Sequence, residues 1–212
     1  MLRDAWSYIV AHPDRFADAL GRHVALSASA LLLAALIAIP AGIALKGRPR
    51  YALFAINAAN VGRTLPSLAV LALVMPMLGT GFAPALFALT LLATPPILIN
   101  TYAAVSQVDP DVIDAARGMG MRSRAITRRI VVPLALPIIA AGVRIAAIQV
   151  ISGAVLAAYI GGGGLGDFIT AGIAMMQLPL LIVGAVPATL LAIGTDLAFG
   201  RLQKALTPRG LA

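Results

Sequence analysis

Residues with reactive or charged side chains are few in this chain, and their densest group lies at residues 114–133, DAARGMGMRSRAITRRIVVP. Five arginines stand there among alanines and glycines that leave a smooth helical surface. Asp109, Pro110 and Asp111 precede the group and favour the first turn of a helix, which Gly118 and Gly120 then end or bend. The chemistry predicted here is docking of another protein. The alternative is a solvated loop whose arginines only set membrane orientation.

No catalytic constellation is evident in the sequence. The only lysines, Lys46 and Lys204, do not follow a glycine-rich phosphate loop, so ATP hydrolysis by that route is excluded. GGGGLG at 161–166 formally matches a dinucleotide pattern but lacks a βαβ context. His12 and His23 are far apart in a ligand-poor region, and cysteine is absent, so no metal site is predicted. We expect a chain that is not an enzyme and binds no cofactor itself.

The composition indicates an integral membrane protein. The 212 residues are 60% hydrophobic and 11% charged, with a mean hydropathy of +0.96, whereas soluble domains carry about 25% charged residues. The net charge of +8 could suggest nucleic acid. Because the arginines cluster beside apolar runs, we interpret the charge as topological and expect no nucleic-acid partner.

Helical spans follow from the apolar runs, since about 20 apolar residues cross a hydrocarbon core of about 30 Å. The sequence predicts an all-α membrane protein with about five transmembrane helices and no second domain. The predicted spans are 24–45, 51–78 with an interruption at GRTLPS (62–67), 83–105, 130–160 and 179–199. They lie in a membrane domain at 24–200. Residues 1–23 are predicted to form an amphipathic segment with Trp6 and Tyr8 at headgroup depth, and 201–212 a basic tail.

The distribution of lysine and arginine predicts the orientation. If the tail is inside, 11 of the 16 basic residues lie in inner connections and three in the outer segment 1–23, while Arg63 and Arg144 fall within spans. The positive-inside rule therefore predicts an N-terminus outside and a C-terminus inside. A helix at 109–125 is then cytoplasmic.

The spacing D-A-A-x3-G-x9-I-x-V-P resembles the EAA motif of the membrane subunits of binding-protein-dependent ABC importers. Asp114 replaces the motif's Glu and Val132 its Leu, and both spacings are intact. The resemblance implies a type I importer (MetI-like) permease fold in the inner, cytoplasmic membrane. It also implies that 109–125 is a coupling helix seated in an ATP-binding subunit. The residues that would couple are Asp114, Ala115, Ala116, Gly120, Ile130 and Pro133.

The same resemblance implies partners and a substrate class. ATP and Mg would bind the ATP-binding subunit. The other implied partners are a second permease copy or paralogue, an extracytoplasmic binding protein and membrane lipid. Three stretches, beginning GRTLPSLAV, NTYAAVSQV and YIGGGGLGD, resemble permeases for glycine betaine, carnitine and choline. A methionine-type or other small amino-acid importer is the alternative. A secondary transporter would show repeats and intramembrane carboxylates, and only Asp196 lies in a predicted span.

Polar residues within the spans are candidates for the translocation path. An arginine at the bilayer centre costs about 2.5–3.5 kcal/mol, so Arg63 should face a partner or water unless it snorkels from a helix end. The family resemblance assigns Arg63, Thr64, Pro66 and Ser67 to the path. Arg144, Gln149 and Ser152 are also candidates, with helix pairing or a dimer seam as the alternative for Arg144. Asp196 is expected to pair with Arg201 or another arginine at the inner surface.

The family resemblance implies that the glycine-rich segment lies at the outer gate. Glycines permit a tight re-entrant turn. The aspartate that follows them would face the binding protein or cap the next helix. The predicted gate residues are Gly161, Gly163, Gly164, Gly166 and Asp167. Aromatic residues make up only 5% of the chain, and no aromatic cluster is evident. Because quaternary ammonium groups favour aromatic cages, high-affinity recognition is expected on a separate binding protein.

Overall fold

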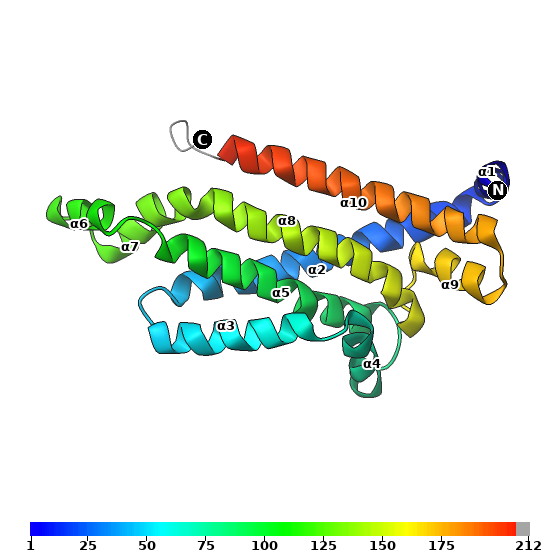
Figure 1. Ribbon diagram of the computed structural model, residues 1–212, viewed down its shortest axis with the longest axis horizontal. Coiled ribbons are helices and arrows are strands. Elements are labelled where there is room, and N and C mark those ends of the chain that lie inside the picture. The colour runs from blue at the N-terminus through cyan, green and yellow to red at the C-terminus, as the bar shows by residue number, and fades with distance from the viewer. Residues whose placement is uncertain (207–212) are drawn as a thin grey trace.

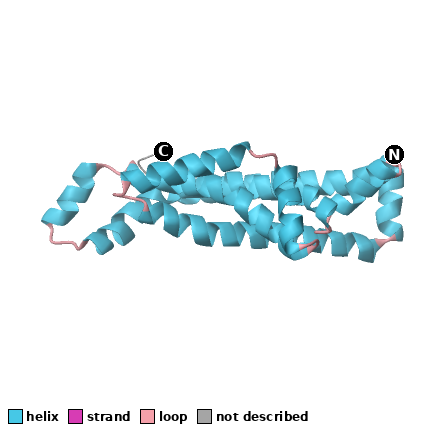
Figure 2. Ribbon diagram, turned by 90° about the horizontal axis from the view of Figure 1, so that it is seen from below, coloured by secondary structure: helices cyan, strands magenta, loops and turns pink. Residues whose placement is uncertain are grey.

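The structure, a computed structural model, describes residues 1–206; residues 207–212 of the predicted basic tail lie outside the described part. Figures 1 and 2 show an elongated bundle whose long helices run lengthwise. The elements in chain order are α1 (Leu2–Ala11), α2 (Pro13–Ala44), α3 (Pro49–Thr64), α4 (Ser67–Leu78), α5 (Phe82–Ser106), α6 (Pro110–Gly118), α7 (Ser123–Ile126), a π-helical turn η1 (Thr127–Val131), α8 (Val132–Leu156), a 3-10 turn η2 (Ala157–Ile160), α9 (Gly166–Ala174) and α10 (Leu178–Leu206).

The membrane-spanning helices agree with the prediction of about five spans. Within the described residues, four helical stretches are long and apolar enough to cross a membrane, and α3 with α4 makes a fifth, bent pair. The helices extend past the apolar runs: α2 begins at Pro13, and the stretch Ser123–Ile160 is continuous over 38 residues. At η1 the helix widens, because the Val132 N–H bonds to the Thr127 carbonyl.

The interruption predicted at residues 62–67 is a sharp bend between α3 and α4, whose axes differ by 99°. Leu65 is extended, with φ −69° and ψ 129°, because a residue before proline is driven out of the helical region. The Thr64 hydroxyl donates to the Val61 carbonyl at 2.7 Å and so satisfies one carbonyl at the end of α3. Figure 1 shows α4 projecting almost at right angles to the bundle.

Small residues hold the long helices together. Ala30, Ala34, Ala38 and Gly42 recur at every fourth position on α2, and all are buried. A Cβ added at Gly42 would lie 2.7 Å from the Thr101 Cβ of α5. A helix face of small residues allows close backbone approach, which is how membrane helices gain packing energy without a hydrophobic driving force. This face therefore holds α2 against α5.

The two ends of the bundle differ in charge. Figure 1 shows the N-terminus, α4 and α9 toward one end, with α6 and the end of α10 toward the other. Three basic segments lie toward the end of the bundle that carries α6: the connection 46–50, the arginines of 117–129 and the start of the predicted tail. The fold thus gathers the basic segments on one side, as the charge distribution requires. Assignment of that side to the cytoplasm stays a prediction.

Candidate coupling and translocation sites

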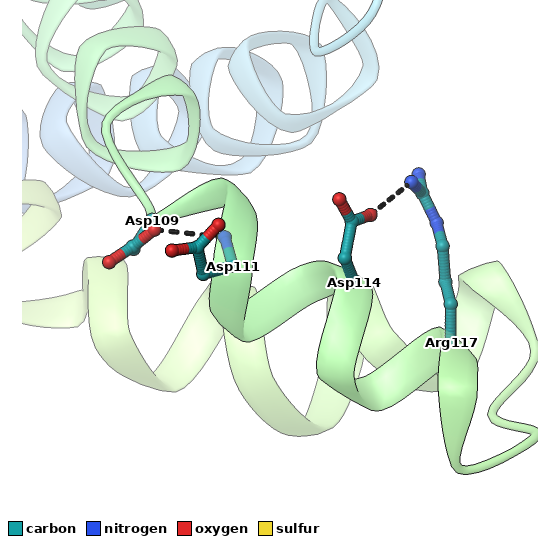
Figure 3. Close-up of polar contacts among 4 residues, drawn as sticks. All are labelled: Asp109, Asp111, Asp114 and Arg117. Carbon is teal, nitrogen blue, oxygen red and sulfur yellow. Dashed lines mark hydrogen bonds and ion pairs between the residues drawn. The ribbon is translucent and has the colours of Figure 1, made fainter.

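Helix α6 is built to begin at a defined residue (Figure 3). The Asp109 carboxylate accepts a hydrogen bond from the Asp111 N–H at 2.9 Å, and Pro110 occupies the first helical position. A capped N-terminus of this kind satisfies a backbone donor that the helix itself cannot pair. One turn later, Asp114 and Arg117 form an exposed ion pair of 2.8 Å. The helix expected from the sequence is therefore present, and it lies outside the candidate spans.

The C-terminus of α6 is a Schellman motif centred on Gly120. The Met121 N–H bonds to the Ala116 carbonyl at 3.1 Å, and the Gly120 N–H bonds to the Arg117 carbonyl at 2.9 Å. Gly120 has a φ of +80°, the left-handed conformation that this motif requires and that glycine adopts without steric cost. The structural function of Gly120 is to end the helix and turn the chain toward α7.

The motif residues of α6 point in different directions. Asp114 and Ala115 are exposed, but Ala116 is 1% exposed and packs in a small core with Val105 and Val131. Ala116 thus seats α6 on the ends of α5 and α8, and Ile130 is partly buried against the same core. Pro133 is exposed near the start of α8. The coupling roles of these residues stay predictions.

An exposed apolar stripe on α6 was not singled out from the sequence. Val112 is 41% exposed and Met119 is 74% exposed, and with the exposed Ala115 they occupy positions i, i+3 and i+7 of one helix side. Helical periodicity applied to 110–119 would have separated this stripe from the inward Ile113 and Ala116. On a helix outside the membrane, exposed apolar side chains in a row indicate a contact surface.

Lys46 lies beside α6 at the basic end. Its Nζ is buried and has no hydrogen-bond partner in the described part of the chain. Burial lowers the pKa of Lys46, and the nearby Arg117 guanidinium lowers it further. An amine that is desolvated next to a like charge destabilises its surroundings unless an anion joins it.

The residues predicted to line the path near the bend are mostly exposed. Arg63 and Thr64 end α3, and Arg63 makes no hydrogen bond or ion pair within residues 1–206. Pro66 is exposed and Ser67 half-buried at the start of α4. The fold brings these four residues together at the bend but supplies no internal counter-charge.

Arg144, Gln149 and Ser152 do not form one group. Arg144 makes a two-pronged ion pair with Asp196 of α10, at 2.6 Å from Nε to Oδ1 and 2.8 Å from the second nitrogen to Oδ2. The partner of Asp196 is therefore Arg144 rather than Arg201. Gln149 and Ser152 are exposed on another side of α8. The structure ties Arg144 to helix pairing and leaves the other two on an open face.

The glycine-rich segment forms a tight turn at the N-terminal end of the bundle. Gly161, Gly163 and Gly164 have φ between +75° and +93°, and a Cβ at Gly166 would overlap the Val155 carbonyl. The turn packs on the preceding outer connection, where the Gly81 N–H donates to the Ile160 carbonyl at 2.7 Å. The predicted tight turn is thus found, and its role as an outer gate stays a prediction.

Asp167 lies in the first turn of α9 and is exposed. Its carboxylate makes no capping bond to α9 in the described chain, so the expected cap is wrong; Asp167 stands inside the helix rather than before it. Partial desolvation raises the pKa of Asp167, and Arg22 and Arg15 oppose that shift. The outer end therefore carries a carboxylate between two arginines.

The structure corrects the expectation that no aromatic cluster exists. The ring of Phe168 on α9 lies 6.0 Å from that of Tyr8 and 6.4 Å from that of Phe16, and the Arg15 guanidinium lies 5.7 Å from its centre. The sequence hides this group because α1 and the start of α2 meet α9 only in the folded chain. Phe168 is 2% exposed, so the cluster is packing and leaves no open cage.

Known proteins share both the sequence and the fold. Residues 30–210 match the family described as "binding-protein-dependent transport system inner membrane component". The carnitine transport permease protein OpuCB of Listeria monocytogenes is 42% identical, covering 90% of this chain and 87% of that protein. The choline transport system permease protein OpuBB of Bacillus subtilis is 41% identical over 89% and 87%. The osmoprotectant import permease protein OsmW of Salmonella typhimurium is 35% identical over 98% and 99%.

Solved structures agree at the level of the fold. The MetNI methionine ABC transporter in an inward-facing conformation superposes with a TM-score of 0.80 at 20% identity, covering 92% of this chain and 97% of that chain. An amino acid ABC transporter gives a TM-score of 0.72 at 19% identity. The all-helical, MetI-like fold predicted from the motif is confirmed. Together with the family match, these findings show that the chain belongs to the inner membrane components of binding-protein-dependent transport systems, the permease subunits of ABC importers.

Proposed function

We propose that this chain is the translocating subunit for a quaternary-amine osmoprotectant, driven by a separate ATP-binding subunit that docks on α6. The observation that carries the proposal is the exposed side of α6, where Val112, Ala115 and Met119 form an apolar stripe beyond the membrane spans. The capped start and the Schellman end make α6 a short rigid body. Movement of a docked subunit would therefore pass to α5 and α8 through Ala116 as rigid-body motion.

The energy source of this proposal is external to the chain. No phosphate-binding loop is present in the sequence, so ATP and Mg are assigned to the docked subunit. The chain itself is proposed to be a transport subunit without enzymatic activity. The amine of Lys46 lies near Arg117 of α6 and has no hydrogen-bond partner within residues 1–206. This supports docking of an acidic surface, because an incoming carboxylate would compensate its charge.

The translocation path for the substrate is proposed to form between two permease chains. Arg63 lies at the bend with no internal partner within residues 1–206, and a charge left facing lipid is costly. A second copy or paralogue placed against this face would enclose Arg63, Thr64 and Ser67 in a water-filled passage. Gln149 and Ser152 offer polar groups on an exposed side of α8.

The substrate class rests on the relatives, whose names give carnitine, choline and osmoprotectant transport. The aromatic cluster around Phe168 is filled by packing and by Arg15, which supports high-affinity recognition on an extracytoplasmic binding protein. A methionine-type substrate has no comparable support, since the likeness to the methionine transporter at 20% identity concerns the fold alone.

Co-purification tests the docking surface. Ala115→Trp is expected to abolish recovery of the ATP-binding subunit with the tagged permease in detergent, because the indole cannot fit where a methyl group stood. Ser123→Trp is the matched control, since Ser123 is exposed on α7 but lies off the stripe. Equal recovery of the ATP-binding subunit with both variants would contradict the assignment of α6.

Uptake tests the substrate and the energy source. Cells expressing the full transporter should accumulate radiolabelled glycine betaine, choline or carnitine, and excess methionine should not compete. Accumulation should cease when the ATP-binding subunit is deleted. Uptake that persists in the deletion would identify a stand-alone secondary transporter instead.

A further inference from the structure

A cavity of about 210 Å³ lies between α2, α8 and α10. Its walls include Leu31 of α2, Ile151 of α8 and Phe199 of α10, and none of the lining residues is an acid, a lysine or an arginine. A cavity of about 150 Å³ is large enough for benzene, so this space can hold part of an apolar ligand. Both α2 and α10 pack on α8 but form no extended interface with each other, and the space lies between them.

Two buried polar side chains line this cavity without partners. His23 is 0% exposed and Ser27 is 7% exposed. The Ser27 hydroxyl makes no hydrogen bond within the described chain. The His23 ring faces the Ile151 backbone, but no hydrogen bond of good geometry joins either ring nitrogen to a described residue. Buried polar groups in proteins are almost always hydrogen-bonded. One helical turn separates the two residues, so both can serve the same ligand.

The glycine-rich turn packs against His23, one of the residues that line the cavity. Gly164 has a φ of +93°, and a Cβ there would lie 3.2 Å from the Cβ and 3.3 Å from the Nδ1 of His23. The turn therefore rests directly on the imidazole. The other residues that line the cavity come from α2, α8 and α10.

The depth of the polar groups identifies the ligand chemistry. His23 directly precedes Val24, where the uncharged apolar run begins, and it lies about 15 Å from the start of α2 at Pro13. Apart from His23, the only polar side chains among the lining residues are Ser27 and Thr195, and the apolar ones extend about 12 Å along α2 as far as Leu31. A ligand must therefore place its polar part at the membrane boundary and its apolar part toward the bilayer centre. A charged osmolyte would find no counter-charge on this lining.

We propose that the cavity holds a membrane phospholipid, with its ester oxygens accepting hydrogen bonds from His23 and Ser27 and one acyl chain lying along Leu31, Leu191 and Phe199. The occupant comes from the bilayer through the gap between α2 and α10. This site is independent of the proposed docking on α6 and of the transported substrate, so either proposal can fail alone.

Photolabelling tests the site on the full chain in vesicles of phosphatidylethanolamine and phosphatidylglycerol. A phosphatidylethanolamine with a diazirine near the carbonyl end of one acyl chain is the probe, and labelled peptides are mapped by mass spectrometry. Label should concentrate on residues 23–31 and 191–199 over other exposed apolar positions such as Phe87 and Leu91. Ser27→Ala should lower this labelling roughly fivefold, the effect of one lost hydrogen bond.

A matched pair of variants separates a built site from general lipid contact. Ala28 lines the cavity, whereas Ala25 is exposed on the same helix outside it. Ala28→Phe should abolish the concentrated label by filling the space, and Ala25→Phe should leave it unchanged. The proposal is overturned if label spreads evenly over all lipid-facing helices or survives Ala28→Phe. It is also overturned if residues 23–31 crosslink to a second copy and exclude the probe.

Discussion

At the scale of single residues, three residues at 109–120 have distinct structural functions. Asp109 caps α6, Ala116 fastens it to the bundle, and Gly120 ends it. A Cβ at Gly120 would meet no atom within 4 Å. Glycine is therefore required at this position for its backbone conformation and not for space.

Replacements of Gly120 should separate backbone strain from docking. Gly120→Val should destabilise the end of α6 by about 1–2 kcal/mol, the cost of a left-handed conformation for a residue with a Cβ. Gly120→Asn should cost less, because asparagine visits that region more readily. Thermal unfolding and recovery of the ATP-binding subunit should both rank glycine above asparagine above valine. Equal behaviour of the asparagine and valine variants would argue against a conformational role.

The buried amine of Lys46 should make the stability of the folded chain depend on pH. The pKa of Lys46 is lowered in the folded chain. At pH values between this folded pKa and the ordinary value near 10.5, the unfolded chain therefore binds more protons than the folded chain. The free energy of unfolding rises with pH across that window. Below the window the buried charge destabilises the fold. Lys46→Met should therefore raise the melting temperature most at neutral pH, with the gain shrinking toward pH 10.5.

The control for this prediction is Lys204→Met. Lys204 is the only other lysine of the chain and is exposed on α10, so its removal should leave the melting temperature unchanged at every pH. A gain in the Lys46→Met variant that does not vary with pH would indicate better packing rather than a relieved charge.

At the scale of elements, contact between helices depends on residues without side-chain bulk. A Cβ at Gly142 of α8 would lie 2.6 Å from the Asn100 Cβ and 3.0 Å from the Pro96 carbonyl of α5. Gly194 lies within α10, and a Cβ added there, by contrast, would have no described atom within 4 Å. The same substitution should therefore have opposite effects at the two sites.

Gly142→Ala should destabilise the protein by about 1–3 kcal/mol, because the methyl group overpacks the crossing of α5 and α8. Gly194→Ala should be neutral or stabilising by up to about 1 kcal/mol through helix propensity. Thermal unfolding in detergent measures both variants. A stable Gly142→Ala protein would show that this crossing is looser than the contacts indicate.

At the scale of the whole molecule, α1 and the C-terminal end of α10 lie toward opposite ends of the bundle (Figure 1). The basic connections and α6 share one end, and the aromatic cluster and the glycine-rich turn share the other. The positive-inside rule assigns α6 to the cytoplasm. This orientation decides whether an ATP-driven partner can reach it.

Cysteine labelling measures that orientation cleanly, because the chain has no cysteine of its own. A thiol reagent that does not cross membranes should modify Asp14→Cys in intact cells. It should modify Ser123→Cys only after the cells are permeabilised. Both positions are exposed, so burial does not confound the comparison. Labelling of Ser123→Cys in intact cells would place α6 outside and contradict the docking proposal.

Local sequence signals determined the class of protein and the placement of its elements. Apolar runs determine spans because hydrocarbon requires them, and Pro66 determines the break after α3 because its clash with Leu65 is local. The start and end of α6 follow equally from Asp109, Pro110 and Gly120. These features depend on neighbours a few residues apart, so a single sequence contains the needed information.

Only the tertiary structure decided which distant residues meet. Arg144 and Asp196 are 52 residues apart in the chain. Phe168 contacts Tyr8 and Phe16, which lie near the other end of the sequence. The inward direction of Ala116 and the cavity at His23 likewise depend on how helices pack. Pairing of this kind is set by complementary surfaces of separate helices, and composition and spacing along the chain do not encode it.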